Sequence, residues 1–540
     1  MSSYLHHRRH SQNIDQGQAY ELGHTSKSVG VDISETHDES KQPPPAVPPT
    51  LESQVRVRRL FSGAQLFMFS LTNMGLWEGM CTNMYFALYE GGPYTFSWSI
   101  LICFFGAISQ AASIGEMASI IPIAGAQYHW TWHLAPSKIK RFATYMQAWF
   151  TWFGYISLLA AVANVTIILL ESLVGLNNPS YVAQGWHTAL LVIAMCTLQA
   201  GMNMYLFWLI PWVEFVAGIL HICLFVVFLV VLAVMGNRHS ASFVFTARNT
   251  SEIQSGWTNQ FVSFHLGMLT CVWSFTGFDG AIHMSEEVRK AKSAVPRAMF
   301  WSIFMNGLLG YAMVITILVA MGSVEDALNS SSPIVAILME VTGSSAATTA
   351  MVTGLFIISF AINMGMIASV SRLTWAWARD GGLPTHFAYV DPKHRVPVRA
   401  VWIVTLLVCI LCLLNIGSSS YIAFGAITSL SSLALYASYA IAISSMLYAR
   451  YSSKGTLQLG EWNFGRWGPY INMFALVYTL WMCVFLPFPS SLPVTGANMN
   501  YCGPVFLFVV VVALVLWVVS AGKNWQGPNI TIMDFVMAQS

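Results

Sequence analysis

The chain has 540 residues, of which 56% are hydrophobic and only 9% are charged. Soluble globular domains carry about 25% charged residues, so this composition excludes a soluble protein and favours one embedded in a lipid bilayer. The net charge of +2 gives no sign of a highly charged partner such as nucleic acid.

The amino-terminal segment 1–58 is polar and ends in a proline-rich stretch at 43–49. Such a segment cannot bury enough apolar surface to fold by itself. It predicts a disordered tail before the first apolar run.

Apolar runs of about 20 residues, long enough to cross a bilayer, recur along the rest of the chain. They predict an all-α integral membrane protein with twelve membrane-spanning helices, none of which contains Lys or Arg. The spans are placed at 65–88, 94–114, 142–164, 187–205, 207–235, 261–283, 299–321, 346–370, 400–415, 420–446, 469–487 and 503–522.

The basic residues divide unevenly between the two sides of these spans. Of the 25 Lys and Arg residues, all but Arg238 and Arg248 fall in tails or loops on one side. Basic residues gather on the cytosolic side of membrane proteins, so both termini are predicted to be cytosolic. Sequons at Asn249 and Asn329 fall in loops on the other side, where they predict glycosylation.

Two spans, the first and the sixth, are interrupted by glycines and an acid at matching places, and each opens one half of a twofold array. Glycine-interrupted spans at corresponding positions of two halves indicate the binding site of a secondary transporter. The predicted substrate-binding residues are Asn73, Gly75, Trp77, Glu78, Gly79, Trp273, Phe275, Thr276, Gly277, Phe278, Asp279 and Gly280.

The interruptions have a physical use. Unwinding a helix frees backbone N–H and C=O groups, which are tolerated only where protein or a water-filled cavity satisfies them. The amino end of the following half-helix suits an anion such as an amino-acid carboxylate, whereas the freed carbonyls and the two acids suit a cation. The neighbouring aromatic rings favour an alkylammonium group, at roughly 0.5–2 kcal/mol per contact.

Glu78 and Asp279 are also candidates for proton coupling, because a buried carboxylate can exchange a proton for a cation. The alternative is structural, since glycines in membrane helices often serve close packing. Glu78 could also lie near enough to the outer leaflet to reach water. Glu214 and His221 are seven residues apart on the fifth span, and could belong to one buried network.

Several stretches of the chain resemble the amino acid/choline transporter family of fungal permeases, within the amino acid–polyamine–organocation superfamily. The resemblance runs from about residue 60 to 520. It is carried by Gly115–Ser119 with Pro122, Gly125 and Tyr128; by Trp273–Phe275, Asp279, His283, Met284, Glu287, Val288 and Pro296; by Ala378–Pro384; and by Pro487–Pro489, Leu492–Thr495 and Asn498–Tyr501. One departure is Glu78, since the choline permeases have no acid there.

The resemblance implies two inverted five-helix repeats with discontinuous first and sixth helices, plus two peripheral helices. It divides the chain into a transporter domain at 60–522 and a short cytosolic tail at 523–540. Within the domain the repeats fall at about 60–235 and 257–446, and the peripheral helices at about 469–522. The implied location is the plasma membrane, with a vacuolar or other internal membrane as the alternative.

The resemblance also implies a small nitrogenous substrate, such as choline, 4-aminobutyrate (GABA), an amino acid or a polyamine, usually taken up with protons. Charged residues predicted on the cytosolic side could form an inner gate that pairs in one access state and separates in another. These gate candidates are Glu116, Arg372, Arg379 and Asp380. A static structural loop is the alternative.

Other functions compete with a proton-coupled importer. The same scaffold could export a nitrogenous metabolite, because direction follows gradients. A nutrient receptor is less favoured, since the carboxyl tail is short. A membrane enzyme is not predicted, because the histidines show no catalytic spacing. ATP-driven pumping is not predicted either, because no GxxxxGK[ST] nucleotide loop occurs. The nine cysteines show no metal-ligand spacing, so neither a metal nor a cofactor is expected.

Overall fold

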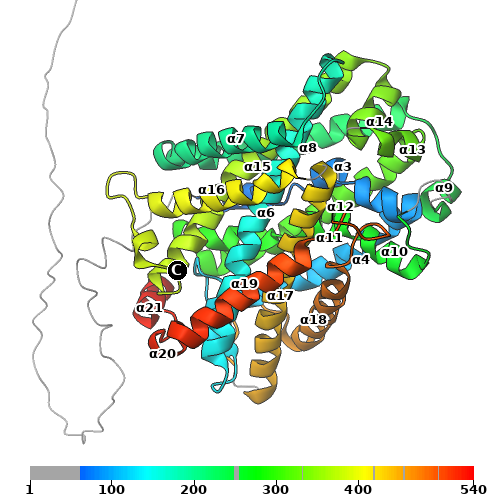
Figure 1. The fold of residues 1–540 in the computed structure, drawn as a ribbon. Helices are drawn as coiled ribbons and strands as arrows, with labels where there is room; N and C mark the ends of the chain where they lie inside the picture. Colours follow the sequence, from blue (N-terminus) through cyan, green and yellow to red (C-terminus); the bar gives the residue numbers. More distant parts are fainter. Residues whose placement is uncertain are drawn as a thin grey trace, which may run out of the picture. The chain divides into compact units, whose positions relative to one another are not determined.

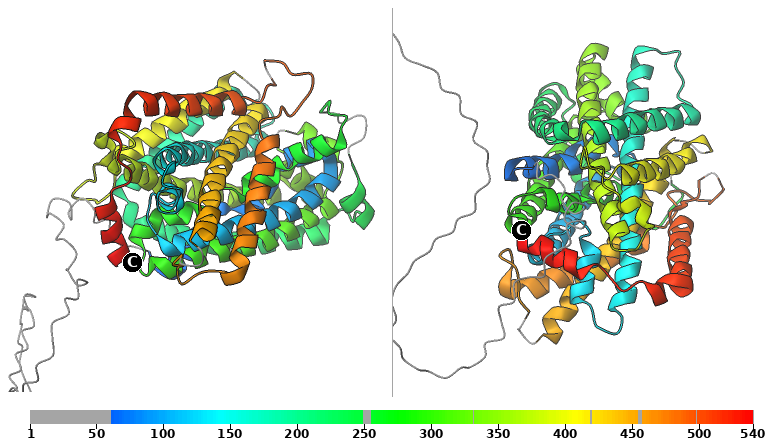
Figure 2. Two further views of the ribbon diagram at one scale, coloured as in Figure 1. Left: turned by 90° about the horizontal axis from the view of Figure 1, so that it is seen from below. Right: turned by 90° about the vertical axis from the view of Figure 1, so that its left-hand side faces the viewer.

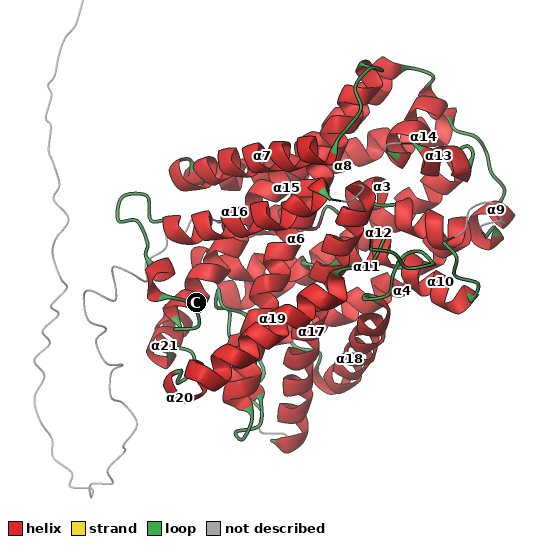
Figure 3. Cartoon of the chain, viewed as in Figure 1, coloured by secondary structure: helices red, strands yellow, loops and turns green. Residues whose placement is uncertain are grey.

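A computed structural model describes residues 61–248, 255–330, 332–417, 420–453, 457–496 and 498–539. The predicted tail at 1–58 and the sequon at Asn249 lie outside these residues. Throughout the described ranges the regular structure is helical, as the sequence predicts (Figure 3). The β-type pairing found in them is an isolated bridge between Phe61 and Val288.

The first part of the helical order corresponds to the first five predicted spans (Figure 1). Its elements are α2 (Gly63–Met74), α3 (Leu76–Thr82), α4 (Tyr85–Ile120), α5 (Gln127–Leu134), α6 (Lys140–Asn177), α7 (Gly185–Tyr205), the 3-10 helix η1 (Phe207–Leu209) and α8 (Ile210–Met235).

The second part begins with two short helices and the broken sixth span. Its elements are α9 (Ala241–Thr246), α10 (Gln260–Gly267), α11 (Leu269–Phe275), the 3-10 helix η2 (Phe278–Glu287), α12 (Ala291–Ala320), α13 (Val324–Asn329), α14 (Pro333–Thr342), α15 (Ser345–Arg379), η3 (Thr385–Ala388), α16 (Val398–Cys412), η4 (Leu413–Ile416) and α17 (Ser420–Ser452). The chain ends with η5 (Gly465–Trp467), α18 (Gly468–Phe485), α19 (Cys502–Leu516), the π-helix η6 (Trp517–Ala521), α20 (Gly522–Asn524) and α21 (Ile530–Gln539).

Eleven helical segments of the described residues are long and apolar enough to cross a bilayer. The first predicted span is not among them, because it is divided between α2, α3 and the start of α4, and α2 and α3 have only 12 and 7 residues and meet at a break. The count of twelve spans therefore stays a prediction. Some helices run well beyond their predicted spans; α6, expected at 142–164, continues to Asn177.

The two predicted interruptions are breaks in the helices. Gly75 separates α2 from α3 with φ 47°, and Gly277 separates α11 from η2 with φ 87°. Both values lie in the left-handed region, where a side chain is strained. A Cβ atom would also come within 2.5 Å of Ile362 Cδ1 at Gly75 and within 2.5 Å of Leu158 Cδ2 at Gly277. Glycine is thus required at both breaks by backbone and by space.

The central helices of the bundle are α6 and α17, which pack against each other (Figure 2). In their most apolar stretches 83% and 89% of the residues are buried, against 17% for α19. α6 also packs on α15, and α4 on α12. The apolar side chains that α19 exposes, such as Phe508 and Val511, are suited to contact with lipid.

The segment after η6 returns to the end of α15. Trp525 is buried beside the rings of Trp377 and Tyr145, and its Nε1 donates to the Asp380 carbonyl at 2.8 Å. The Asn529 amide donates to the Asp380 carboxylate at 3.2 Å. The carboxyl-terminal segment is therefore packed against the helical bundle at Asp380.

Replacing Gly75 with Ala is expected to lower the melting temperature of the detergent-purified protein. The left-handed backbone costs a side chain about 1–2 kcal/mol, and the contact with Ile362 adds to this. Gly343→Ala is the matched control, because Gly343 has φ +61° but no atom within 4 Å of a Cβ. Equal losses in the two variants would show that close packing at the break contributes nothing.

Candidate functional site

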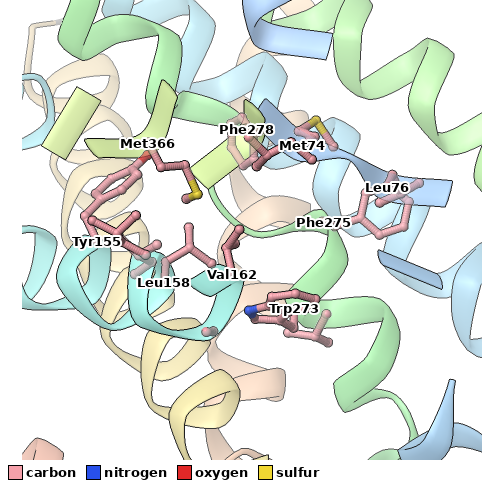
Figure 4. Close-up of a cluster of buried hydrophobic side chains, with 14 of the residues drawn as sticks. Met74, Leu76, Tyr155, Leu158, Val162, Trp273, Phe275, Phe278 and Met366 are labelled. Atoms are coloured by element: carbon pink, nitrogen blue, oxygen red, sulfur yellow. The ribbon is translucent and has the colours of Figure 1, made fainter. Parts of the chain in front are cut away.

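A small cavity lies where the two broken helices meet. Its volume is about 30 Å³, roughly the share of one water molecule in the liquid. It is lined by Asn73, Met74, Gly75, Glu78, Gly79, Thr82, Leu158, Val162, Val165, Trp273, Ser274, Thr276, Ser359, Ile362 and Met366. Figure 4 shows the apolar part of this region, with Leu158 and Val162 of α6 near Met366 and Trp273. This cavity is lined by residues of both broken helices at their breaks.

The two broken helices approach each other closely on either side of the cavity. A Cβ at Gly79 in α3 would lie 2.9 Å from Ser274 Oγ in α11, and a Cβ at Gly280 in η2 would lie 2.6 Å from Asn73 Nδ2 in α2. These two glycines therefore serve close approach, whereas Gly75 and Gly277 supply the left-handed backbone.

Neighbouring helices satisfy much of the polar chemistry near the first break. Asn306 of α12 donates to the Leu71 carbonyl at 3.0 Å, and the Gly79 amide donates to the Gly75 carbonyl at 2.7 Å. Two buried oxygens that line the cavity, Asn73 Oδ1 and Glu78 Oε2, have no hydrogen-bond partner among the described residues. They are available to a ligand.

Helix α8 holds both sides of the first break. His221 Nδ1 lies 2.7 Å from Glu78 Oε1 in α3, and Thr72 in α2 donates to Glu214 Oε2 at 2.8 Å. Glu78 is 2% exposed and His221 is fully buried. The expectation that Glu214 and His221 share a helix face fits this arrangement, with each residue contacting a different half of the broken span. Glu78 is turned into the bundle and is not at its surface.

Six of the twelve predicted binding residues line the cavity. They are Asn73, Gly75, Glu78, Gly79, Trp273 and Thr276.

The other six lie close to the breaks but do not line the cavity. Trp77 packs on the rings of Phe225 and Phe228 in α8, and Phe275 stacks on Phe104 in α4 with 6.1 Å between centroids. Phe278 faces Tyr439. Gly277 and Gly280 are in close contact with the neighbouring helices, as described above. Of the four aromatic residues predicted to face a substrate, Trp273 is the one that lines the cavity.

Asp279, the sixth of these residues, is fully buried and forms hydrogen bonds outside the cavity lining. Its carboxylate accepts from Gln127 of α5 and from the Tyr439 hydroxyl of α17. Asp279 thus connects the second broken helix to two neighbours, whereas Glu78 keeps one carboxylate oxygen without a partner.

Sequence reasoning missed the wall of the cavity formed by α6 and α15. Leu158, Val162 and Val165 lie on one face of α6, and Ser359, Ile362 and Met366 on one face of α15. Their helical spacing is the only signal in the sequence, and it is hidden because these spans are apolar around much of their circumference.

The four predicted gate residues are all paired, but with partners other than one another. Arg372 Nε lies 2.9 Å from Glu287, and Arg379 binds both oxygens of Glu286 at 3.1 and 3.2 Å.

The other two gate candidates join further elements. Glu116 of α4 accepts from Arg450 of α17 at 2.6 Å. The Asp380 carboxylate accepts from the Tyr128 hydroxyl at 2.7 Å and lies 3.1 Å from His129 Nε2. All four sites are largely buried, so these contacts join α4, α5, η2, α15 and α17 at one end of the bundle.

The charge of Asp380 is set by competing effects. Burial opposes ionisation, but His129, Arg379 and the Tyr128 hydroxyl outweigh burial and hold the pKa of this carboxyl below its ordinary value. Asp380 therefore favours the carboxylate form in the folded protein, and that form stabilises the contacts around it.

Asp380→Asn is expected to lower the melting temperature at pH 7. Because the folded pKa is lower than the unfolded value of about 3.9, the ionised carboxylate stabilises the fold above that pH and stops doing so as the pH falls through the folded pKa. The difference in melting temperature between this variant and the unsubstituted protein should stay constant down to about pH 5 and shrink below about pH 4. Thermal unfolding across this range measures it, with exposed Asp326→Asn as the control. A difference that grew on acidification would contradict this assignment.

Comparison with known proteins identifies the family. Residues 61–514 match the family described as amino acid permease. The chain is 30% identical over 490 residues to amino-acid permease 2 of Neurospora crassa, covering 87% of this chain and 86% of that protein. It is 28% identical to the choline transporter of Saccharomyces cerevisiae, with 88% and 84% covered. It is also 28% identical to the amino-acid permease BAT1 homolog of Oryza sativa subsp. japonica, with 88% and 94% covered. Together with the eleven long apolar helices among the described residues, this match shows that the chain is an integral multi-pass membrane transport protein and not an enzyme, and that it belongs to the amino acid permease family.

Proposed function

We propose that this protein is a proton-coupled secondary transporter of a small ammonium-bearing solute, such as choline, GABA or an amino acid. One observation carries the proposal: the two broken helices enclose a cavity lined by Glu78, and one buried carboxylate oxygen of this residue has no protein partner among the described residues. The names of the relatives, which include amino-acid permeases and a choline transporter, support the same substrate class.

The charge at the first break favours a cation. Glu78 lies in the first turn of α3, where a negative side chain opposes binding of an anion at the helix end. Its Oε2 would lie 3.8 Å from a Cβ at Gly75, so the acid faces the break. Trp273 adds an aromatic ring, and Asn73 an amide oxygen, to the same cavity. An ammonium group can use all three.

The volume of the cavity supports a closed state. About 30 Å³ is too small for choline or an amino acid. Binding therefore requires the walls formed by α6 and α15 to move relative to the broken helices. The buried ion pairs of Arg372 and Arg379 join η2 to α15, and in this proposal they separate when that end of the protein opens.

The pair formed by His221 and Glu78 is the proposed site of the coupling proton. One proton shared between Nδ1 and Oε1 makes the pair electrically neutral. Glu214, on the same helix, supplies a second carboxylate. When one proton and one ammonium ion are bound, their two positive charges are balanced by the carboxylates of Glu78 and Glu214. This balance lowers the free-energy cost of keeping the charges in the membrane interior.

The proposed topology rests on the charge distribution. The excess of basic residues on one side supports cytosolic termini, and the resemblance to fungal permeases is the support for a place in the plasma membrane. Asn329, exposed at the end of α13, is then an outward-facing glycosylation acceptor.

Reconstituted protein tests the function. Labelled choline, GABA and single amino acids are offered to proteoliposomes with an alkaline interior, and at least one should accumulate with saturable kinetics. A protonophore should reduce accumulation to the level of empty liposomes. Accumulation that persists with the protonophore would refute proton coupling while leaving transport established.

Two substitutions test the roles of the pair. Glu78→Gln removes both the acid that holds the cation and the partner of His221, so it should raise KM tenfold or more, the effect of losing about 1.4 kcal/mol, and should also reduce proton-driven accumulation. His221→Gln should abolish proton-driven accumulation but leave exchange of labelled for unlabelled substrate measurable. Glu340→Gln, at an exposed acid on α14, is the control. Accumulation by the His221 variant equal to that of the unsubstituted protein would reject the assigned proton site.

A further inference from the structure

Glu90, near the start of α4, is a buried acid that the central site does not use. Its side chain is 5% exposed, and neither carboxylate oxygen has a hydrogen-bond partner among the described residues. None of the ion pairs formed by those residues includes it. An uncompensated carboxylate is costly to bury, so a ligand or a proton is expected at this position.

Two cavities meet at Glu90, away from the breaks. One has a volume of about 210 Å³ and lies between α4, α10, α11, α17, α18 and residues from 486–491 and 498–500. The other, of about 670 Å³, extends past Arg248 and Trp257. Glu90 and His265 line both cavities, whereas neither lines the cavity between the broken helices.

Aromatic rings surround the acid in the smaller cavity. Tyr85, Phe86 and Tyr89 precede Glu90 on the same helix, and Phe485 and Phe488 come from α18 and the chain after it. The Tyr85 and Tyr89 rings stack with 5.4 Å between centroids, and Phe86 meets Tyr85 edge-on. A carboxylate among aromatic faces is the arrangement that attracts an organic ammonium ion.

The nearby basic groups do not neutralise Glu90. The guanidinium of Arg248 lies over the Tyr94 ring at 4.3 Å and binds Gln260. The ring of His265 uses Nδ1 with the Phe261 carbonyl at 2.7 Å. The Ser255 hydroxyl faces the carboxylate but brings no charge. The carboxyl group therefore has no cationic partner among the described residues, and that place is open to a cation from the cavity.

We propose that Glu90 and the aromatic rings of the smaller cavity form a second binding site, specific for small organic ammonium ions. About 210 Å³ admits a quaternary ammonium group that the closed central cavity cannot hold. As part of the proposed transport function, this site holds the cationic substrate at the end of the bundle predicted to face outside. The binding itself does not depend on that function.

Binding of tetramethylammonium to the purified full chain tests the proposal, with isothermal titration as the readout. Glu78→Gln weakens the central site, so binding that remains in this variant reports on Glu90. Adding Glu90→Gln should weaken the remaining binding about tenfold or more, the effect of losing one buried contact to a charged group. Adding Glu340→Gln instead should leave it unchanged.

A second variant tests the site even if the Glu90→Gln protein fails to fold. Phe86→Leu keeps the acid but removes one aromatic ring, and it should also weaken binding of tetramethylammonium.

A second lipid identifies the occupant of the site. Measurements in phosphatidylglycerol and in phosphatidylcholine distinguish a free amine from a lipid headgroup. If tetramethylammonium binds in phosphatidylglycerol but not in phosphatidylcholine, the choline headgroup competes for the site, and this result also supports the proposal. Equal binding with and without Glu90→Gln would overturn the proposal and leave Glu90 as a protonated structural acid. Failure of transport with binding at Glu90 intact would refute only the function of the central site.

Discussion

The structure depends on one constraint, that a backbone leaving the helical conformation inside a membrane must be satisfied by its neighbours. At the first break, the side chain of Asn306 donates a hydrogen bond to the Leu71 carbonyl, and the Gly79 amide donates one to the Gly75 carbonyl. Glu214 and His221 of α8 bond to side chains on the two sides of Gly75. The break is thus held by α8 and α12, and the cavity beside it exists because those helices do not fill it.

The buried charged groups divide into those whose contacts join helices and those that line a cavity. Arg372 and Arg379 are matched to Glu287 and Glu286, and Asp279 is matched to Gln127 and Tyr439. Such matched groups join helices together. Glu78 Oε2 and the Glu90 carboxylate remain without partners among the described residues. In a low-dielectric interior this difference is large, because an unpaired buried charge costs far more than a paired one. Ligand binding is therefore assigned to Glu78 and Glu90, the two acids that line cavities.

The glycines show how similar motifs can serve different needs. Gly75 and Gly277 are left-handed, so they permit the breaks themselves. Gly79 and Gly280 have no such backbone, and instead allow Ser274 and Asn73 to come close. Both broken helices contribute one glycine of each kind. The two interrupted segments, which are similar in sequence, therefore use their glycines in the same two ways. The inverted repeat as a whole stays a prediction.

The sequence by itself determined the helical class, most of the membrane-crossing segments and the positions of both breaks. These features depend on local properties: apolar length, and the backbone freedom of Gly75 and Gly277. Only the tertiary structure decided which side chains at the breaks face the cavity. Trp77 and Phe275 turn toward α8 and α4, and the partner of Glu78 lies 143 residues away on α8. The walls from α6 and α15, and the unpaired state of Glu90, likewise depend on packing between distant segments. Hydrophobic periodicity cannot specify such packing where a helix is apolar on nearly every face.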